Sequence, residues 1–257
     1  MVRKPMPEGG RVLVKVVVAY KWARDPEDAA VRGDGSVDWR GAKMAAGEDD
    51  PAAVAVACSV ASAGGRDLVG LTIGDGDTSW ALARGVGHAV AVPDAPSLAD
   101  EAATAALLVA AVGWIGEVDV VVIGDADGYP GVPAVLAGLL GWPALLGVST
   151  ATVEGGRLLA TRRAGDLDET VSLDLPAVLG VAAASAEKRA PGMKEILAAR
   201  KRPVEAVPLS ALGVSLPGRL VSRGTRVPDA APARIFGGDP ADAARQLVAA
   251  LRADGVL

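Results

Sequence analysis

Short runs of apolar, mostly β-branched residues alternate along the first 180 residues with segments of helical periodicity. The clearest run is VVVI at residues 120–123, which suits a strand covered on both faces, as in a parallel sheet. A loop of Gly, Asp and Pro follows, and apolar residues then recur at intervals of three and four over 132–140, forming one face of a helix. Gly141 and Pro143 are typical helix-ending residues. The unit is a strand, a small-residue loop and a helix.

The same alternation recurs on both sides of this unit. Further strands are predicted at residues 11–20, 67–73, 89–92 and 144–148, with helices starting near Asp49, Ser79 and Ser97. Alternating strands and helices predict a doubly wound, Rossmann-like α/β fold with a parallel sheet.

The pattern changes after residue 150. Residues 150–153, 157–162 and 170–175 are short apolar or alternating segments, and Gly155-Gly156 between the first two is a hairpin signal. We therefore expect an antiparallel hairpin flap, after which the apolar run at 176–181 rejoins the main sheet.

Domain organisation follows from the loss of periodicity near residue 200. Residues 1–200 form the predicted nucleotide-binding α/β domain, and 201–257 form an extended C-terminal arm that ends in a helix. This last helix starts at Asp239-Pro240 and has an apolar stripe of Ala243, Leu247 and Leu251. A lone amphipathic helix cannot bury its stripe against itself, so we expect it to pack on a partner chain.

Composition excludes several function classes. A net charge of −5 argues against nucleic-acid binding through bulk electrostatics. The single Cys58 and the single His88 exclude an internal disulfide and the usual metal clusters, and His88 is expected to be structural. No apolar stretch has the length of a membrane span or the form of a signal peptide, so no membrane insertion and a cytoplasmic location are expected.

The loop after residue 123 is the candidate binding site. Ligands of open α/β sheets bind at the carboxyl ends of the strands, and a helix N-terminus offers N–H groups to a phosphate. An ordinary βα turn with nothing bound is the alternative. Asp125 and Asp127 are turn formers or ribose partners rather than an acid–base pair, because the sequence supplies no metal ligand set beside them.

Several segments, in order, resemble one family, the beta subunit of electron transfer flavoproteins. They are VVVAYKWARDPE at 16–27, DGSVDWRG at 34–41, AGLLGWP at 137–143, ATRRAGDLDETVSLDLPAV at 160–178 and MKEILAARKRPVE at 193–205. The likeness covers about residues 11–255, and it lies in the order and spacing of the segments.

The resemblance implies a heterodimer with an alpha subunit that holds most of the FAD, and a buried AMP in the beta subunit itself. It implies an electron carrier rather than an enzyme, which receives electrons from a donor dehydrogenase and passes them to a quinone reductase. The last helix would lie against the alpha subunit. Met193, followed by Lys194, stands where the family inserts a leucine into the dehydrogenase.

The resemblance also implies which residues contact the nucleotide, between the loops after the first, second and fourth strands. They are Ala19, Lys21, Gly47, Asp49, Ile73, Gly74, Gly124, Asp125, Asp127, Gly131 and Val132.

Two departures from the family pattern affect this site. Residues 46–49, AGED, replace the family's Asn-Pro-x-Asp, and GDADGYPGVPA at 124–134 lacks its Thr-Gly-Gln. Backbone N–H groups and the helix dipole remain, and these bind an anion more weakly than a full set of side-chain partners. The alternative function is a stand-alone regulatory protein that binds an adenine nucleotide on the same fold. Such a protein would have no need of the arm and last helix.

Overall fold

The computed structural model describes residues 15–65, 67–96, 100–124, 131–182, 190–216, 220, 223–229 and 233–257, and the structural statements below concern these residues. They fall into two units. The larger unit runs to Ala30 and from Asp38 to Arg223, and the smaller one comprises Val31–Val37 and Gly224–Leu257.

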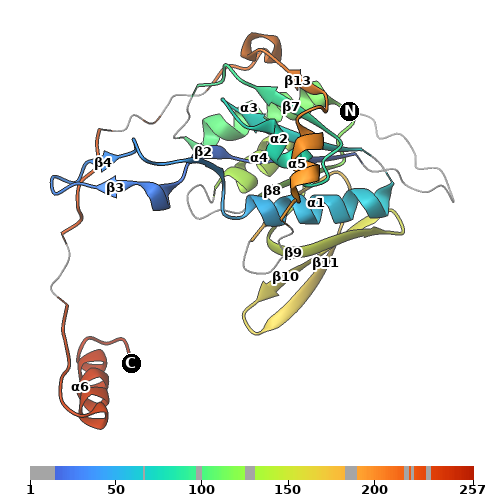
Figure 1. The fold of residues 1–257 in the computed structure, drawn as a ribbon. Coiled ribbons are helices and arrows are strands. Elements are labelled where there is room, and N and C mark those ends of the chain that lie inside the picture. Colours follow the sequence, from blue (N-terminus) through green and yellow to red (C-terminus); the bar gives the residue numbers. More distant parts are fainter. Residues whose placement is uncertain are drawn as a thin grey trace. The chain divides into compact units, whose positions relative to one another are not determined.

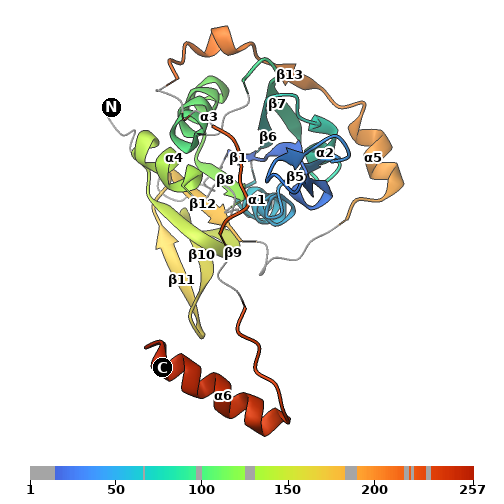
Figure 2. The same ribbon diagram turned by 90° about the vertical axis from the view of Figure 1, so that its left-hand side faces the viewer.

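A mixed sheet forms the centre of the larger unit (Figures 1 and 2). Within the described residues its nine strands have the order β11-β10-β9-β12-β8-β1-β6-β7-β13. Their bounds are β1 Val16–Ala19, β6 Leu68–Ile73, β7 His88–Val92, β8 Val120–Gly124, β9 Ala144–Glu154, β10 Arg157–Ala164, β11 Leu167–Leu173, β12 Ala177–Val181 and β13 Val204–Ala206.

Seven of these strands, from β9 to β13 in sheet order, pair in parallel, while β10 and β11 add an antiparallel extension. The Gly155-Gly156 turn joins β9 to β10, as the hairpin signal predicted. The hairpin continues the main sheet because β9 is longer than expected, so that its first part pairs with β12 and its remainder with β10. β12 enters the sheet between β9 and β8, which confirms that the apolar run near 177 returns to it.

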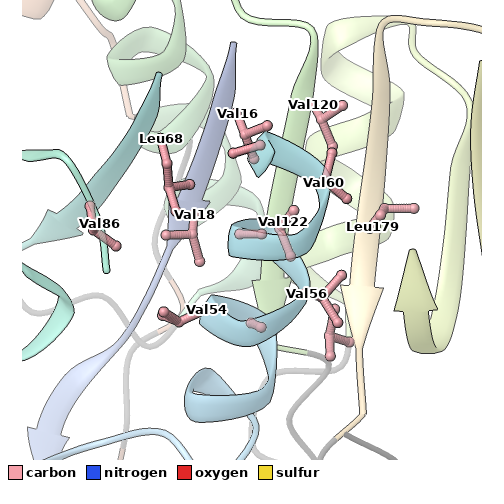
Figure 3. Packing of buried hydrophobic residues seen from close by; sticks show 14 of the residues in the cluster. Val16, Val18, Val54, Val56, Val60, Leu68, Val86, Val120, Val122 and Leu179 are labelled. Carbon is pink, nitrogen blue, oxygen red and sulfur yellow. The ribbon is translucent and has the colours of Figure 1, made fainter. Parts of the chain in front are cut away.

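Helices cover both faces of the sheet, which confirms the doubly wound, Rossmann-like α/β prediction. α1 (Asp50–Gly64), α2 (Thr78–Leu82) and α5 (Met193–Ala199) pack on one face, and α3 (Glu101–Ile115) and α4 (Val132–Leu140) pack on the other. Figure 3 shows Val54, Val56 and Val60 of α1 pointing at β-branched residues of the central strands. The strands are apolar on both faces because both faces are buried.

The start of α3 differs from the sequence prediction. Asp100 is its N-cap, and its Oδ1 accepts hydrogen bonds from the N–H groups of Ala102 (2.9 Å) and Ala103 (3.2 Å). Ser97, expected to start this helix, lies outside the described residues. An aspartate one residue before the apolar periodicity is as good a cap as a serine, which explains the displacement.

The segment after residue 200 stays with the sheet for longer than expected. β13 pairs in parallel with β7, and the short 3-10 helix η3 (Leu209–Leu212) packs Leu209 and Leu212 against the face that carries α3. The smaller unit therefore takes up the chain only from Gly224.

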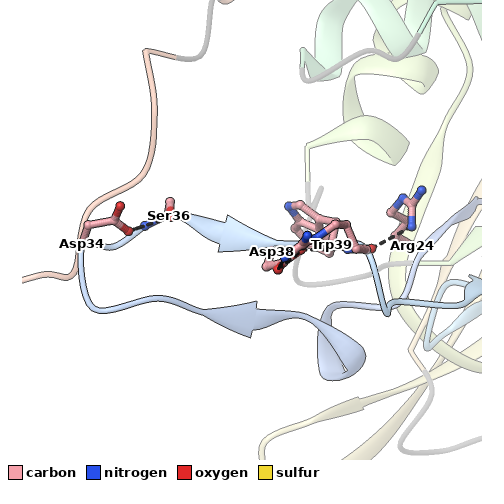
Figure 4. Close-up of polar contacts among 6 residues, drawn as sticks. Arg24, Asp34, Ser36, Asp38 and Trp39 are labelled. Atoms are coloured by element: carbon pink, nitrogen blue, oxygen red, sulfur yellow. Dashed lines mark hydrogen bonds and ion pairs between the residues drawn. The ribbon is translucent and has the colours of Figure 1, made fainter.

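The excursion between β1 and α1 contains two small sheets. β2 (Trp22–Arg24) pairs with β5 (Met44–Ala46), and β3 (Ala30–Val31) pairs with β4 (Val37–Asp38) after the single-turn helix η1 (Pro26–Asp28). Polar side chains fix the turns (Figure 4): Asp34 accepts from Ser36, and Arg24 donates to the carbonyl oxygen of Trp39 at 2.7 Å.

The smaller unit ends in α6 (Pro240–Ala253), and none of the residues of this helix is buried in the described chain. Asp239 caps α6 by accepting from Ala241 and Asp242, and an ion pair of 3.1 Å joins Arg234 to Asp254. In the segment before it, Thr225 donates a hydrogen bond of 2.7 Å to the carbonyl oxygen of Gly35.

Candidate functional site

The candidate site lies where the strand order reverses. From β1 the chain proceeds to β6 and β7 on one side, and α3 then carries it back to β8 on the other side of β1. The register places Ala19 of β1 beside Ile123 of β8 and Leu71 of β6, so the carboxyl ends of these strands lie at one edge. A crevice at such a reversal is the usual ligand site of an open α/β sheet.

A buried carboxylate joins the first two loops of this edge. Oδ2 of Asp50 accepts hydrogen bonds from the backbone N–H groups of Lys21 (2.9 Å) and Gly47 (2.7 Å), and the residue is 4 % exposed. Asp50 is the first residue of α1, whereas Asp49 is the N-cap and makes no side-chain cap hydrogen bond. Two loops separated by more than twenty residues are therefore linked through one side chain.

Burial sets the proton affinity of this carboxyl. The pKa of Asp50 is raised to about 7, mainly by desolvation and in smaller part by the neighbouring Asp49, while the two N–H donors and the Lys21 charge limit the rise. Desolvation also lowers the pKa of the Lys21 ammonium group, an effect that the Asp50 carboxylate opposes. The protonation of Asp50 therefore changes near neutral pH.

Gly124, the last residue of β8, lies against the start of α1. A Cβ atom at this position would lie 3.0 Å from both Cβ of Asp49 and Oδ1 of Asp50. The structure thus brings Lys21, Gly47, Asp49 and Gly124 close together. The absence of a side chain at Gly124 lets the strand end and the helix start approach closely; a Cβ atom would require the neighbouring atoms to move by a few tenths of an ångström.

Gly131 begins α4 and meets a different partner. Its N–H donates to Oε1 of Glu101 at 3.1 Å, and a Cβ atom on Gly131 would collide with that carboxylate. Glu101 belongs to the first turn of α3, so the starts of two helices on the same face of the sheet are joined through it. Val132, the first residue of α4, is buried and packs into the core of that face.

The two glycines after β6 have different roles. Gly74 has a φ of +80°, and its N–H donates to the carbonyl oxygen of Val92 at 2.9 Å. Gly76 faces Thr72, with which a Cβ atom would collide. Gly74 therefore permits a left-handed turn, and Gly76 permits a close approach of the chain to β6.

Replacing Gly74 by alanine should lower the free energy of unfolding by about 1–2 kcal/mol, because only the left-handed backbone is penalised. No heavy atom lies within 4 Å of the new Cβ atom, so packing is unchanged. Gly74→Asn should cost less, since asparagine tolerates this conformation. Urea unfolding of the two variants checks the order, and equal stability of wild type and Gly74→Ala would contradict the assigned conformation.

Other predicted site residues are placed as follows. Asp125 and Asp127 lie outside the described residues. Ala19 and Ile73 are strand residues of β1 and β6 that pack into the core of one face. Met193 is 72 % exposed at the first position of α5, and Lys194 follows it.

A depression of about 300 Å³ lies beside α2, apart from the predicted residues. Arg202 is among its lining residues, and the guanidinium group donates to the carbonyl oxygens of Leu82 and Val86 at 3.3 and 2.7 Å. Across the described chain no group of three His, Cys, Asp or Glu side chains is placed to hold a metal ion. Among the same residues no helix is both long and apolar enough to cross a membrane.

Among the described residues, the backbone donors of the predicted site do not fit a nucleotide phosphate as they stand. The N–H groups of Lys21 and Gly47 bind Asp50, that of Gly131 binds Glu101, and that of Gly74 binds Val92. A phosphate needs such donors, and it would have to displace carboxylates that are already bound to three of them.

Sequence reasoning missed the two acids that matter most here, Asp50 and Glu101. The Asp-Asp-Pro at the start of α1 signalled an acidic helix start without showing which acid turns inward. Glu101 looks in the sequence like any acid in the first turn of a helix. No local pattern indicates its hydrogen bond with Gly131, thirty residues later.

Comparison with known proteins identifies a family that the chain matches. A model of the electron transfer flavoprotein domain matches residues 40–212. Among curated proteins, the chain is similar to electron transfer flavoprotein subunit beta of Mycobacterium leprae (strain TN), with 37% identity over 112 residues, or 42% of each chain. It is also similar to the proteins of that name from Mycobacterium bovis and Mycobacterium tuberculosis H37Rv, each 36% identical over 110 residues, 42% of this chain and 41% of theirs. The matched segment thus spans about two fifths of these relatives.

Proposed function

The chain belongs to the electron transfer flavoprotein family, and from that premise we propose that it is the beta-type subunit of a heterodimeric electron carrier. The partner would be an alpha-type subunit that holds most of the FAD. Electrons would pass from a donor dehydrogenase to this flavin and on to an acceptor of the quinone reductase type. The chain is not an enzyme in its own right in this proposal, and its location is the cytoplasm.

The observation that supports the proposal is the exposure of the amphipathic helix α6. It contains no buried residue, and Leu247 and Val248 are exposed although both lie in an amphipathic helix. Exposed apolar surface of this kind is typical of a protein–protein contact. A stand-alone nucleotide-binding regulator, the alternative from sequence, gives α6 no function.

The proposed heterodimer is tested by co-expression. The chain should co-purify with a candidate alpha-type subunit through two affinity steps, and the complex should carry flavin, identified by absorbance and by mass after heat release. A chain that remains monomeric with every alpha-type subunit of its own source organism, and a flavin content that does not depend on this chain, would contradict the proposal.

The flavin itself is assigned to the partner chain, so no residue of this chain is assigned to it. A bound FAD supplies the electron-accepting and electron-donating group. This chain would contribute the surface that holds the partner, through α6, and the surface that meets the dehydrogenase, through Met193 and Lys194.

Replacing Met193 by alanine should slow electron transfer from the cognate dehydrogenase several-fold, because a few exposed apolar anchors dominate many interfaces. Flavin content and melting temperature should change little, since Met193 is 72 % exposed and its loss opens no cavity. Stopped-flow reduction of the complex by the dehydrogenase measures the rate.

Leu167→Ala is the matched control, because Leu167 is an equally exposed apolar residue, 74 %, at the start of β11. It should leave the rate unchanged. If Met193→Ala lowers the melting temperature while the rate stays the same, Met193 is a packing residue and the docking surface lies elsewhere.

A further inference from the structure

The start of α4 already binds a carboxylate of the chain itself, the side chain of Glu101. Glu101 is anchored at the start of α3, and its Oε1 accepts the Gly131 N–H at 3.1 Å. The absence of a side chain on Gly131 lets the carboxylate come this close, since a Cβ atom there would collide with it. Both the donor and the space at this position are therefore occupied.

A carboxylate and a phosphate compete for the same features of a helix N-terminus, namely unpaired N–H groups and the positive end of the dipole. α4 has few such donors, because Pro133 in its first turn has no N–H. With the Gly131 N–H bound to Glu101, the described residues at the start of α4 offer a phosphate an incomplete set of donors and place a negative charge beside it.

Asp50 likewise occupies backbone donors, in the neighbouring loops. Its Oδ2 binds the N–H groups of Lys21 and Gly47, and its Oδ1 lies close to Gly124 at the end of β8. Two carboxylates of the chain thus take three of the backbone donors at the carboxyl edge of the sheet. The charge of Glu101, joined by that of Asp50 where Asp50 is ionised, opposes the approach of a phosphate dianion.

We propose that Glu101 is the specificity residue that excludes a nucleotide phosphate from this site, so that the chain holds no AMP. The proposal rests on the beta-subunit function and refines it: this member of the family carries flavin in its complex and no second, phosphate-bearing nucleotide in this chain. Asp50 supports the exclusion, and Glu101 determines it.

The test uses the full-length chain, in complex with its partner where the two co-purify. Small molecules released by heat are identified by mass, and AMP and adenosine are each titrated by calorimetry. Wild type should release no AMP and should bind AMP no more tightly than adenosine. Glu101→Ala should gain about tenfold in the affinity for AMP relative to adenosine, as expected when a hydrogen bond to a charged group becomes available.

Two further variants separate occupancy from charge. Glu101→Gln keeps an oxygen that can accept the Gly131 N–H, so it should gain much less than Glu101→Ala. Glu48→Ala removes an exposed acid near the start of α1 and should leave both affinities unchanged. Should Glu101→Ala fail to fold, Glu101→Ser, which shortens the side chain and keeps a residue compatible with a first helical turn, serves in its place.

Stoichiometric AMP in the wild-type protein would overturn the proposal. So would a folded Glu101→Ala or Glu101→Ser variant that binds AMP no better than wild type. These outcomes are independent of the beta-subunit function, which is judged by partner binding and flavin content. A flavin-bearing heterodimer that also contains AMP would refute only the role of Glu101.

Discussion

Asp50→Asn should abolish most of the change in folding stability between about pH 4 and pH 7. In the wild type, the pKa of Asp50 is raised by burial to about 7 from an ordinary value of 3.8. Well below pH 3.8 the carboxyl is protonated in both the folded and the unfolded chain and contributes no pH dependence. Between pH 4 and 7 the unfolded chain loses this proton while the folded chain keeps it, so wild-type stability falls as pH rises.

The size of this effect follows from the shift. About three pKa units correspond to roughly 4 kcal/mol, which is the order of magnitude by which burial of the charged carboxylate opposes folding above pH 7. Asparagine cannot ionise, and its side-chain oxygen can still accept the N–H groups of Lys21 and Gly47. Its amide N–H₂ group lacks the acceptor it needs if the site stays closed, which costs about 1–3 kcal/mol. The net expectation at pH 8 is a variant that is about 1–3 kcal/mol more stable than wild type.

Urea unfolding of wild type and Asp50→Asn at pH steps from 4 to 8 measures this difference. As pH rises from 4 to 8, the free energy of unfolding of Asp50→Asn should increase by several kcal/mol relative to that of wild type. Glu48→Gln is the control, since Glu48 is exposed two residues away, and its curve should run parallel to that of wild type. If the stability of Asp50→Asn also changed with pH in parallel with that of wild type, Asp50 would be ionised in both the folded and the unfolded chain. This result would refute the burial of Asp50 as a neutral acid.

Much of the fold could be predicted from the sequence because its signals are local. The apolar run at β8, the helical periodicity of α4 and the Gly-Gly turn between β9 and β10 each depend on neighbouring residues, and each was placed correctly. β13 was missed because three exposed residues, VEA, show neither alternation nor a buried run. Only its pairing with the edge of β7 makes it a strand.

The candidate site was harder to predict, for a physical reason. The glycines at 47, 124 and 131, which the family resemblance named, lie near strand ends and helix starts. The acids that contact them are set by tertiary geometry: Asp50, not Asp49, turns toward Lys21, and Glu101 reaches Gly131 from another helix. Hydrogen bonds between loops leave no periodic trace in a sequence.

Placing an aspartate on the apolar face of α6 should abolish assembly of the proposed heterodimer. Ala243, Ala250 and Leu251 are partly covered and Leu247 is 45 % exposed, so these four residues mark one stripe of the helix. A buried, unpaired carboxylate in an interface costs several kcal/mol. The double variant Leu247→Asp/Leu251→Asp should therefore lose the partner, with an apparent affinity lowered by more than about a hundredfold.

Ala249→Asp is the matched control, because Ala249 is exposed and lies on the opposite side of α6 from the stripe. It adds a charge at nearly the same point along the chain and should leave assembly intact. The main unit should be unaffected in both variants, since α6 belongs to the smaller unit and the sheet has its own core. Size-exclusion chromatography of co-expressed chains with flavin absorbance reads the outcome. A double variant that still elutes as a flavin-bearing heterodimer would show that the stripe does not face the partner. The exposed helix would then need another explanation.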